Sequence, residues 1–229
     1  MLFREEDEDL QVLPFADRGE AGRTLAGELS SYAGRSDVVV LGLPRGGVPV
    51  ASAVAGALHL PLDVLIVSKL GSPWSSELAM GAVAEEGVQV LDLSIVKAMC
   101  VLQEDLQEVV AAAQKELETQ ERLYRGDRPL GVEGRTVILV DDGIATGCSV
   151  LAAIAAIRLK GAARVVVAVP VAPASGCSAI RMEADEVISV AEPDMFLAVS
   201  QWYEDFSPVS DEDVCHLLKA PAAPMPRVA

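Results

Sequence analysis

Aromatic side chains are scarce in this sequence, which limits how its interior can be filled. Phe, Trp and Tyr make up 4% of the 229 residues, although 51% of the residues are hydrophobic. The core must therefore consist mainly of Val, Leu, Ile and Ala, which is typical of buried parallel strands covered by helices. The high apolar content also excludes a chain that is disordered throughout.

Cysteine, histidine and long apolar runs are also in short supply. Two histidines and four scattered cysteines without a Cys-x-x-Cys pair give poor support to a structural zinc site. No apolar run reaches the roughly 20 residues that span a bilayer, and the chain begins with acidic residues, unlike a secretory signal. We expect a cytoplasmic protein without a membrane partner. Its cysteines should be reduced thiols: Cys100, Cys148, Cys177 and Cys215.

Positive charge is outnumbered by negative charge. Lys and Arg total 18 against 34 Asp and Glu, which gives a formal net charge of −16. Such a surface repels nucleic-acid phosphate, so no nucleic-acid partner is expected. An anionic substrate is compatible with this charge only if a few cations, backbone N–H groups or a metal ion meet it locally.

Short β-branched runs alternate with helical patterns along most of the chain. This alternation predicts an α/β fold in which helices flank a mainly parallel sheet. The predicted strands are 37–43, 62–67, 136–140, 164–169 and 186–190. Of the predicted helices between them, one ends near 58 and two cover 146–160 and 174–182.

Three segments lie outside this alternation. They are an amphipathic helix over 17–33, a short hairpin over 81–91 with its turn at 85–87, and a helical stretch over 93–124. We expect one domain over 1–229 with a core at about 34–213, a helical insertion or cap over 92–126, and flexible ends at 1–9 and 220–229.

The strongest candidate site follows the predicted strand 136–140, because ligands of open α/β sheets bind at the carboxyl ends of strands. Two adjacent carboxylates there can accept hydrogen bonds from the vicinal hydroxyls of a ribose. A small-residue turn then opens a helix and exposes N–H groups and hydroxyls that suit a phosphate. The alternative is an Asp helix cap beside an incidental second acid. The segment reads Asp141, Asp142, Gly143, Ile144, Ala145, Thr146, Gly147, Cys148 and Ser149.

Two further predicted strand ends carry cations or glycines. After the first strand, Arg45 offers a fork of donors suited to a diphosphate, and Gly46 and Gly47 expose amides at a helix start. Lys69 follows the second predicted strand, and its alternative role is that of a solvated loop lysine.

The segment 141–149 resembles the ribose-phosphate-binding motif of the type I phosphoribosyltransferases, in which two acids precede a loop ending in Thr-Gly-x-Thr/Ser. Cys148 stands where that family usually has Ala or another small residue. Arg45-Gly46-Gly47 resembles the diphosphate-binding loop, and Lys69 the basic residue that meets the diphosphate. Over about 37–213, the chain resembles a bacterial group of predicted phosphoribosyltransferases without a settled acceptor.

The resemblance implies a twisted, mainly parallel sheet with a small hood, and an enzyme that binds phosphoribosyl diphosphate and Mg²⁺. The phosphoribosyl group would pass to a nitrogenous acceptor, with a nucleobase expected, and diphosphate would leave. Asp141 and Asp142 would hold the ribose hydroxyls and the metal, directly or through water. The family also implies a possible homodimer and a mobile lid over 71–84.

In purine-using relatives, aromatic residues of the C-terminal hood contact the base. Trp202, Tyr203 and Phe206 are the corresponding candidates here, and a plain aromatic core is their alternative. Near Glu186 those relatives tend to place an aromatic that stacks on the base, so the acid there argues against a purine acceptor.

Two other functions stay open at this stage. One is a non-catalytic regulatory protein that binds phosphoribosyl diphosphate, against which Arg45 and Lys69 argue because a sensor has less need of leaving-group stabilisation. The other is a phosphohydrolase that acts on nucleotides or ribose phosphates. A response-regulator-like receiver is disfavoured, because the sequence shows neither a phosphoacceptor on a separate strand nor a Lys at a later strand end.

Overall fold

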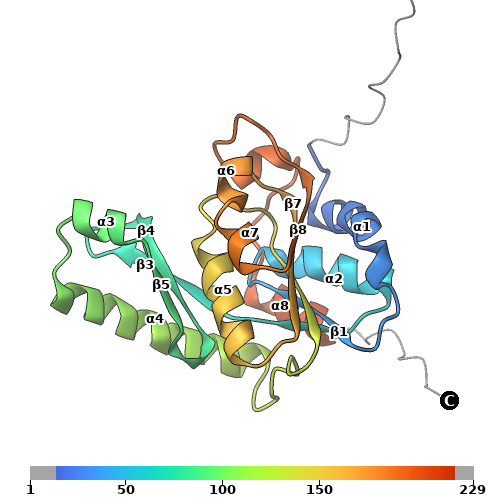
Figure 1. The fold of residues 1–229 in the computed structure, drawn as a ribbon, viewed down its shortest axis with the longest axis horizontal. Helices are drawn as coiled ribbons and strands as arrows, with labels where there is room; N and C mark the ends of the chain where they lie inside the picture. Colours follow the sequence, from blue (N-terminus) through green and yellow to red (C-terminus); the bar gives the residue numbers. More distant parts are fainter. Residues whose placement is uncertain (1–13, 220–229) are drawn as a thin grey trace, which may run out of the picture.

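The computed structural model describes residues 14–219, without the side chains of 75–79, 86 and 175. The ends expected to be flexible, 1–9 and 220–229, lie outside this range. The main sheet is fully parallel, in the order β2-β1-β6-β7-β8 (Figure 1). The predicted parallel sheet is therefore confirmed. Its strands are β1 Val38–Gly42, β2 Leu62–Val64, β6 Thr136–Val140, β7 Arg164–Val171 and β8 Glu186–Ala191.

Helices cover both faces of this sheet, since successive residues of a strand point to opposite sides. In β6, Val137 and Leu139 pack on the side of α5 (Cys148–Leu159). Ile138 and Val140 pack on the side of α1 and α2. Both faces of the strands are buried, which explains their continuous apolar runs. The two helices of the second face are α1 Arg18–Glu28 and α2 Gly47–Leu58.

A second, antiparallel sheet extends from the main body and carries strands in the order β3-β4-β5 (Figure 1). The predicted hairpin over 81–91 corresponds to β4 and β5, with a 3-10 turn at Glu85–Gly87 between them. β4 begins earlier than predicted and also pairs with β3. The strands are β3 Val67–Ser72, β4 Ser75–Ala84 and β5 Gln89–Leu91. Residues 71–84, the expected lid, therefore lie largely in this sheet, and their closure stays a prediction.

One predicted strand is wrong in a way that matters for the site. The segment 62–67 is not a single strand, because the chain leaves the main sheet after β2 and joins the second sheet at β3. Leu65 and Ile66 form the crossing and are fully buried. Lys69 consequently lies inside β3 instead of following a strand of the main sheet.

Three predicted helices are shorter or interrupted. The stretch 93–124 forms α3 Leu93–Ala98 and α4 Gln103–Tyr124, separated where Cys100 adopts a φ of 50°, which no right-handed helix can include. The segment 174–182 forms α6 Ala174–Cys177 and α7 Ile180–Glu183. The helix expected over 17–33 ends at Glu28 and continues as a 3-10 turn, Ser30–Tyr32. Within residues 14–219, no helix combines the length and apolarity needed to cross a membrane.

The start of the described chain pairs with the segment around Tyr203 beside the main sheet. Phe15 forms a parallel bridge with Tyr203, and its N–H donates to the carbonyl of Trp202 at 2.9 Å. The C-terminal segment contains a 3-10 turn, Val199–Trp202, and then α8, Asp211–Lys219, which packs on α2 and α4. Residues near both ends are thereby brought to the carboxyl edge of β6.

Candidate functional site

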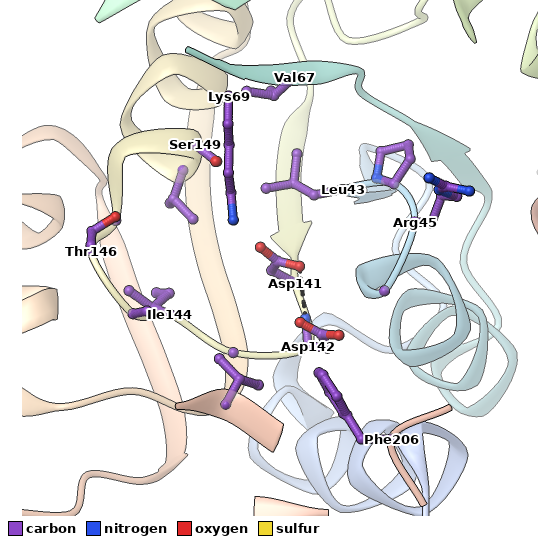
Figure 2. Close-up of a pocket in the computed structure, with 17 residues that line it drawn as sticks. Leu43, Arg45, Val67, Lys69, Asp141, Asp142, Ile144, Thr146, Ser149 and Phe206 are labelled. Atoms are coloured by element: carbon purple, nitrogen blue, oxygen red, sulfur yellow. Dashed lines mark hydrogen bonds between the residues drawn. The ribbon is translucent and has the colours of Figure 1, made fainter. Parts of the chain in front are cut away.

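A cavity of about 360 Å³ lies at the carboxyl edge of the main sheet, where β1 and β6 end (Figure 2). Its wall combines the loop after β1, the strand β3 of the second sheet and the loop after β6. Two residues of the C-terminal segment, Val199 and Phe206, complete it on the side that we call the hood. Most of the predicted site residues line it: Arg45, Gly46, Lys69, Asp141, Asp142, Gly143, Ile144, Ala145, Thr146, Gly147, Ser149 and Phe206. Gly47 and Cys148, the first residues of α2 and α5, follow lining residues in sequence but do not line the cavity themselves.

The two acids follow β6 and are partly buried in the cavity wall. The N–H of Asp142 donates to Oδ1 of Asp141 at 2.9 Å, which fixes the first carboxylate. Burial, and then the neighbouring Asp142 charge, raise the pKa of Asp141. Burial likewise raises the pKa of Asp142, although Arg18 and Lys69 oppose that shift. A cation or a hydroxyl-bearing ligand that satisfies these carboxylates would relieve this cost.

Glycine allows the loop after β1 to approach the acids. A Cβ atom on Gly46 would overlap Oδ2 of Asp142, and one on Gly47 would lie 2.8 Å from the Cα of Asp141. A residue with a Cβ atom at Gly47 would require the backbone to move, and one at Gly46 would displace either the Asp142 carboxylate or the loop. The peptide bond between Pro44 and Arg45 in the same loop is cis.

The turn after the acids is open for an anion. Ile144 donates its N–H to the carbonyl of Val171 at 3.0 Å, which anchors the start of the turn. In the part of the chain that the structure describes, the amides of Ala145, Thr146 and Gly147 donate no hydrogen bond to protein acceptors. Gly147, with a φ of 78°, then leads into α5. Amides of this kind at a helix start suit a phosphate group.

The two predicted cations lie differently in the cavity. Lys69 reaches from β3 across the space above Asp141 (Figure 2), and its charge lowers the pKa of both acids. Arg45 points away from the acids, and its guanidinium lies 3.8 Å from the carboxylate of Asp211. That pair is about half exposed, so it holds Arg45 only weakly. Tyr124 donates its hydroxyl to the same Asp211 carboxylate.

Arg18, which no sequence motif singles out, is the cation in direct contact with the acid pair. Its Nε lies 2.9 Å from Oδ2 of Asp142, and the two side chains are 11% and 15% exposed. Its guanidinium stacks on Phe206, with 3.9 Å between the Cζ atom and the ring centroid. Arg18 lies 124 residues before Asp142 in an ordinary amphipathic helix, so no local signal could have revealed the pair.

The three hood candidates occupy different positions. Phe206 lines the cavity. Tyr203 is buried beneath the acids, and its hydroxyl donates to the backbone carbonyl of Asp142 at 2.6 Å. Trp202 stacks on Phe196, with 6.3 Å between the ring centroids, and is not part of the cavity wall. Of the three, Phe206 therefore faces the cavity, whereas Tyr203 supports the acid loop.

Glu186 has no bearing on the acceptor, contrary to the expectation from the sequence. It begins β8 at the amino edge of the sheet, opposite the cavity. It accepts hydrogen bonds from Tyr32 at 2.5 Å and from Arg164 at 2.8 Å. The acid at this position therefore does not argue against a purine.

Known proteins similar to this chain agree with this architecture. A family model described as "Phosphoribosyl transferase domain" matches residues 12–207. Two Mycobacterium tuberculosis proteins, each named "Putative phosphoribosyl transferase" (MT0597 of strain CDC 1551 and Rv0571c of strain H37Rv), are 46% identical over 208 residues. The match covers 89% of this chain and 46% of theirs, so this chain spans about half the length of these curated relatives.

A solved structure, that of TT1426 from Thermus thermophilus, is 42% identical to this chain. It covers 90% of this chain and 98% of its own, with a TM-score of 0.74. The family and the fold class implied by the sequence resemblance are therefore confirmed.

Proposed function

Because this chain belongs to the phosphoribosyl transferase domain family, we propose that it binds phosphoribosyl diphosphate and transfers the phosphoribosyl group to a nitrogenous acceptor. The observation that carries this proposal is the cavity itself. Two partly buried carboxylates, an open amide turn at Ala145–Gly147 and the Lys69 ammonium face one space of about 360 Å³. That volume is suited to a small phosphorylated sugar with an acceptor beside it.

Each part of the cavity meets one part of the proposed substrate. The ribose hydroxyls donate to Asp141 and Asp142, and the terminal phosphate accepts from the amides of the turn and from the hydroxyls of Thr146 and Ser149. The diphosphate lies towards Gly46 and Lys69, where positive charge offsets the charge that builds on the leaving group. A nitrogen lone pair attacks the anomeric carbon as its bond to diphosphate breaks. The bonding electrons leave with the diphosphate oxygen, and the acceptor loses a proton.

The acid pair also fits a magnesium ion that shares its coordination with substrate. Among residues 14–219, no group of three or more His, Cys, Asp or Glu side chains could hold a metal by itself. Mg²⁺ commonly binds through one or two carboxylates together with water and substrate phosphates, which matches a site with Asp141 and Asp142 as its protein ligands. When bound, the ion would supply positive charge opposite the departing diphosphate.

A nucleobase is the proposed acceptor class. Phe206 and Val199 give the hood side of the cavity an apolar surface, against which a flat ring can pack. The homodimer and the cytoplasmic location expected from the sequence stay predictions, which analytical ultracentrifugation and cell fractionation would test.

A regulatory protein that binds the same sugar without turnover is the second candidate. The observation that favours it is the position of Arg45, whose side chain is directed towards Asp211 instead of the acids. Catalysis requires this cation, or Lys69 alone, to meet the leaving diphosphate.

Calorimetry with phosphoribosyl diphosphate, with and without Mg²⁺, tests binding, and a panel of nucleobases monitored for diphosphate release tests turnover. Binding followed by base-dependent diphosphate release supports a transferase. Binding without release supports the regulatory candidate, and release of phosphate without any acceptor indicates a phosphohydrolase. Absence of binding in the presence of Mg²⁺ overturns the proposal.

A further inference from the structure

Arg18 is held on three sides at the rim of the acid pair. Its Nε contacts Oδ2 of Asp142 at 2.9 Å, and one terminal nitrogen donates to the carbonyl of Ser207 at 2.9 Å. The ring of Phe206 covers the guanidinium at 3.9 Å. Two segments distant from α1 in sequence, one at Asp142 and one at Phe206 and Ser207, therefore fix this side chain, which in turn fixes one oxygen of Asp142.

The contact leaves the other oxygen of Asp142 available to a ligand. Within the described range 14–219, no hydrogen bond reaches Oδ1 of Asp142, and this residue lines the cavity. Arg18 itself is not part of the lining. Gly46 lies against the same pair, because a Cβ atom there would lie 3.4 Å from Nε of Arg18 and would overlap Oδ2 of Asp142.

The two acids consequently face different partners. Asp142 already carries an opposite charge on one oxygen, supplied by the protein. Asp141 accepts a hydrogen bond from a neutral backbone N–H and has the Lys69 charge across the cavity. A divalent cation is attracted more strongly to a carboxylate whose charge is not already matched at contact distance.

We propose that Arg18 is a positioning residue: it orients Asp142 towards a ribose hydroxyl and leaves Asp141 as the carboxylate that serves the cation. This inference rests on the proposed function, since it assigns separate tasks within the same site. It predicts that loss of Arg18 weakens recognition of one ribose hydroxyl, whereas loss of the Asp141 charge weakens metal binding.

The test compares Arg18→Met, Arg18→Lys, Asp141→Asn and a matched control, Arg23→Met, which alters an exposed arginine on the same helix. The probes are ribose 5-phosphate and its 2-deoxy and 3-deoxy analogues, titrated by calorimetry. The unmodified protein should prefer ribose 5-phosphate over both analogues, by about tenfold for each charge-assisted hydrogen bond lost.

In Arg18→Met, ribose 5-phosphate should no longer bind more tightly than the analogue that lacks the hydroxyl recognised by Asp142. The affinity for that analogue should be unchanged. The preference for ribose 5-phosphate over the other analogue should persist. Arg18→Lys should restore only part of it, because an ammonium has no planar fork to span Asp142 and Ser207. Electron paramagnetic resonance measures the binding of Mn²⁺ to each protein in the presence of phosphoribosyl diphosphate. This binding should be retained in Arg18→Met and weakened in Asp141→Asn. Arg23→Met should match the unmodified protein in every measurement.

Urea unfolding of each variant separates a local effect from a loss of the fold. An Arg18→Met protein that is folded and keeps both hydroxyl preferences overturns the inference and leaves the proposed function intact. Equal loss of Mn²⁺ in Arg18→Met and Asp141→Asn also overturns it. If the unmodified protein binds none of the sugar phosphates, the proposed function itself fails, and this inference fails with it.

Discussion

At the scale of single residues, the site depends on the absence of a side chain at Gly46. A methyl group there would overlap Oδ2 of Asp142, so either the loop after β1 or the carboxylate must move. We expect Gly46→Ala to weaken phosphoribosyl diphosphate binding by at least about tenfold, since a misplaced hydrogen bond to a charged group costs roughly this much. Calorimetry in the presence of Mg²⁺ measures the change.

Gly56 provides the matched control for this substitution. It lies within α2, as part of the same chain segment, and a Cβ atom there meets nothing within 4 Å. Gly56→Ala should leave binding unchanged and stabilise the helix by about 0.5–1 kcal/mol. Unaltered binding by Gly46→Ala would show that the loop moves away from Asp142 when the ligand enters.

Asp141 is expected to reduce the stability of the free protein. Its raised pKa means that ionising this group costs free energy in the folded protein that it does not cost in the unfolded chain. Asp141→Asn keeps the acceptor for the Asp142 amide and removes the charge. We therefore expect the variant to unfold at higher urea concentration, with a gain of more than about 1 kcal/mol at neutral pH.

The pH dependence of this gain follows from the sign of the shift. A raised carboxyl pKa destabilises the fold only above the pKa of the unfolded chain, so the difference between the two proteins should shrink as the pH falls towards about 4. Urea unfolding at several pH values from neutral to about 5.5 would show the trend. A constant difference would mean that another effect of the substitution is responsible.

The local part of the site could be predicted from the sequence, because a strand, two acids and a glycine-containing turn are contiguous. Asp141–Ser149 and Arg45–Gly47 needed only their neighbours to be recognised. Arg18 could not be predicted, since its contact with Asp142 depends on how α1 packs against the sheet. The separate positions of Trp202, Tyr203 and Phe206 likewise depend on tertiary packing, although the three residues are nearly adjacent.

At the scale of elements, the crossing from the main sheet to the second sheet places Lys69. Residues 62–67 contain neither Gly nor Pro and are apolar apart from Asp63, so nothing local marks the change of sheet at Leu65 and Ile66. A buried ion pair between Arg125 and Glu85 fixes the crossing. Arg125 donates to the carbonyl of Val64 at 3.2 Å, and the N–H of Ile66 donates to Glu85 at 3.3 Å.

The Glu85–Arg125 pair should therefore show strong energetic coupling. The two side chains are each 2% exposed and 2.8 Å apart, and Lys160 lies 3.7 Å from the same carboxylate. Arg125→Met leaves a buried carboxylate short of its main partner and should cost about 3–5 kcal/mol. The double variant Glu85→Met with Arg125→Met should cost less than the sum of the single changes.

Urea unfolding of the four proteins of this cycle measures the coupling. The exposed pair Arg35–Asp37 supplies the control, because its side chains are 43% and 53% exposed. Arg35→Met should cost less than about 1 kcal/mol. Strict additivity of the Glu85 and Arg125 changes would exclude the pair as the fixing contact of the crossing.

At the scale of the whole molecule, the complete site requires both sheets, the helix α1 and the segment that carries Phe206. The acids follow a strand of the main sheet, Lys69 comes from the second sheet, Arg18 comes from α1, and Phe206 comes from the segment before α8. Sequence patterns could predict the layers of this architecture, but they could not predict which distant segments meet. The net charge of −16 makes this convergence necessary, since the cations must be gathered at one place to hold an anion.

A ligand that requires this convergence should stabilise the whole fold, because the unfolded chain cannot bind it. At about 100 times its dissociation constant, a ligand adds roughly 2.7 kcal/mol. For a chain of this size, that corresponds to a rise of about 5–10 °C in the unfolding temperature. Scanning calorimetry should show this rise with phosphoribosyl diphosphate and Mg²⁺ together, and a much smaller one with either alone.

Asp141→Asn separates stability from binding in the same experiment. Without ligand, its unfolding temperature should exceed that of the unmodified protein, because the variant has no carboxyl whose pKa is raised by folding. The additional rise on adding phosphoribosyl diphosphate and Mg²⁺ should be largely lost, because the carboxylate assigned to the cation is absent. An equal ligand-induced rise in both proteins would mean that the sugar binds away from Asp141, and the assignment of this cavity would then be wrong.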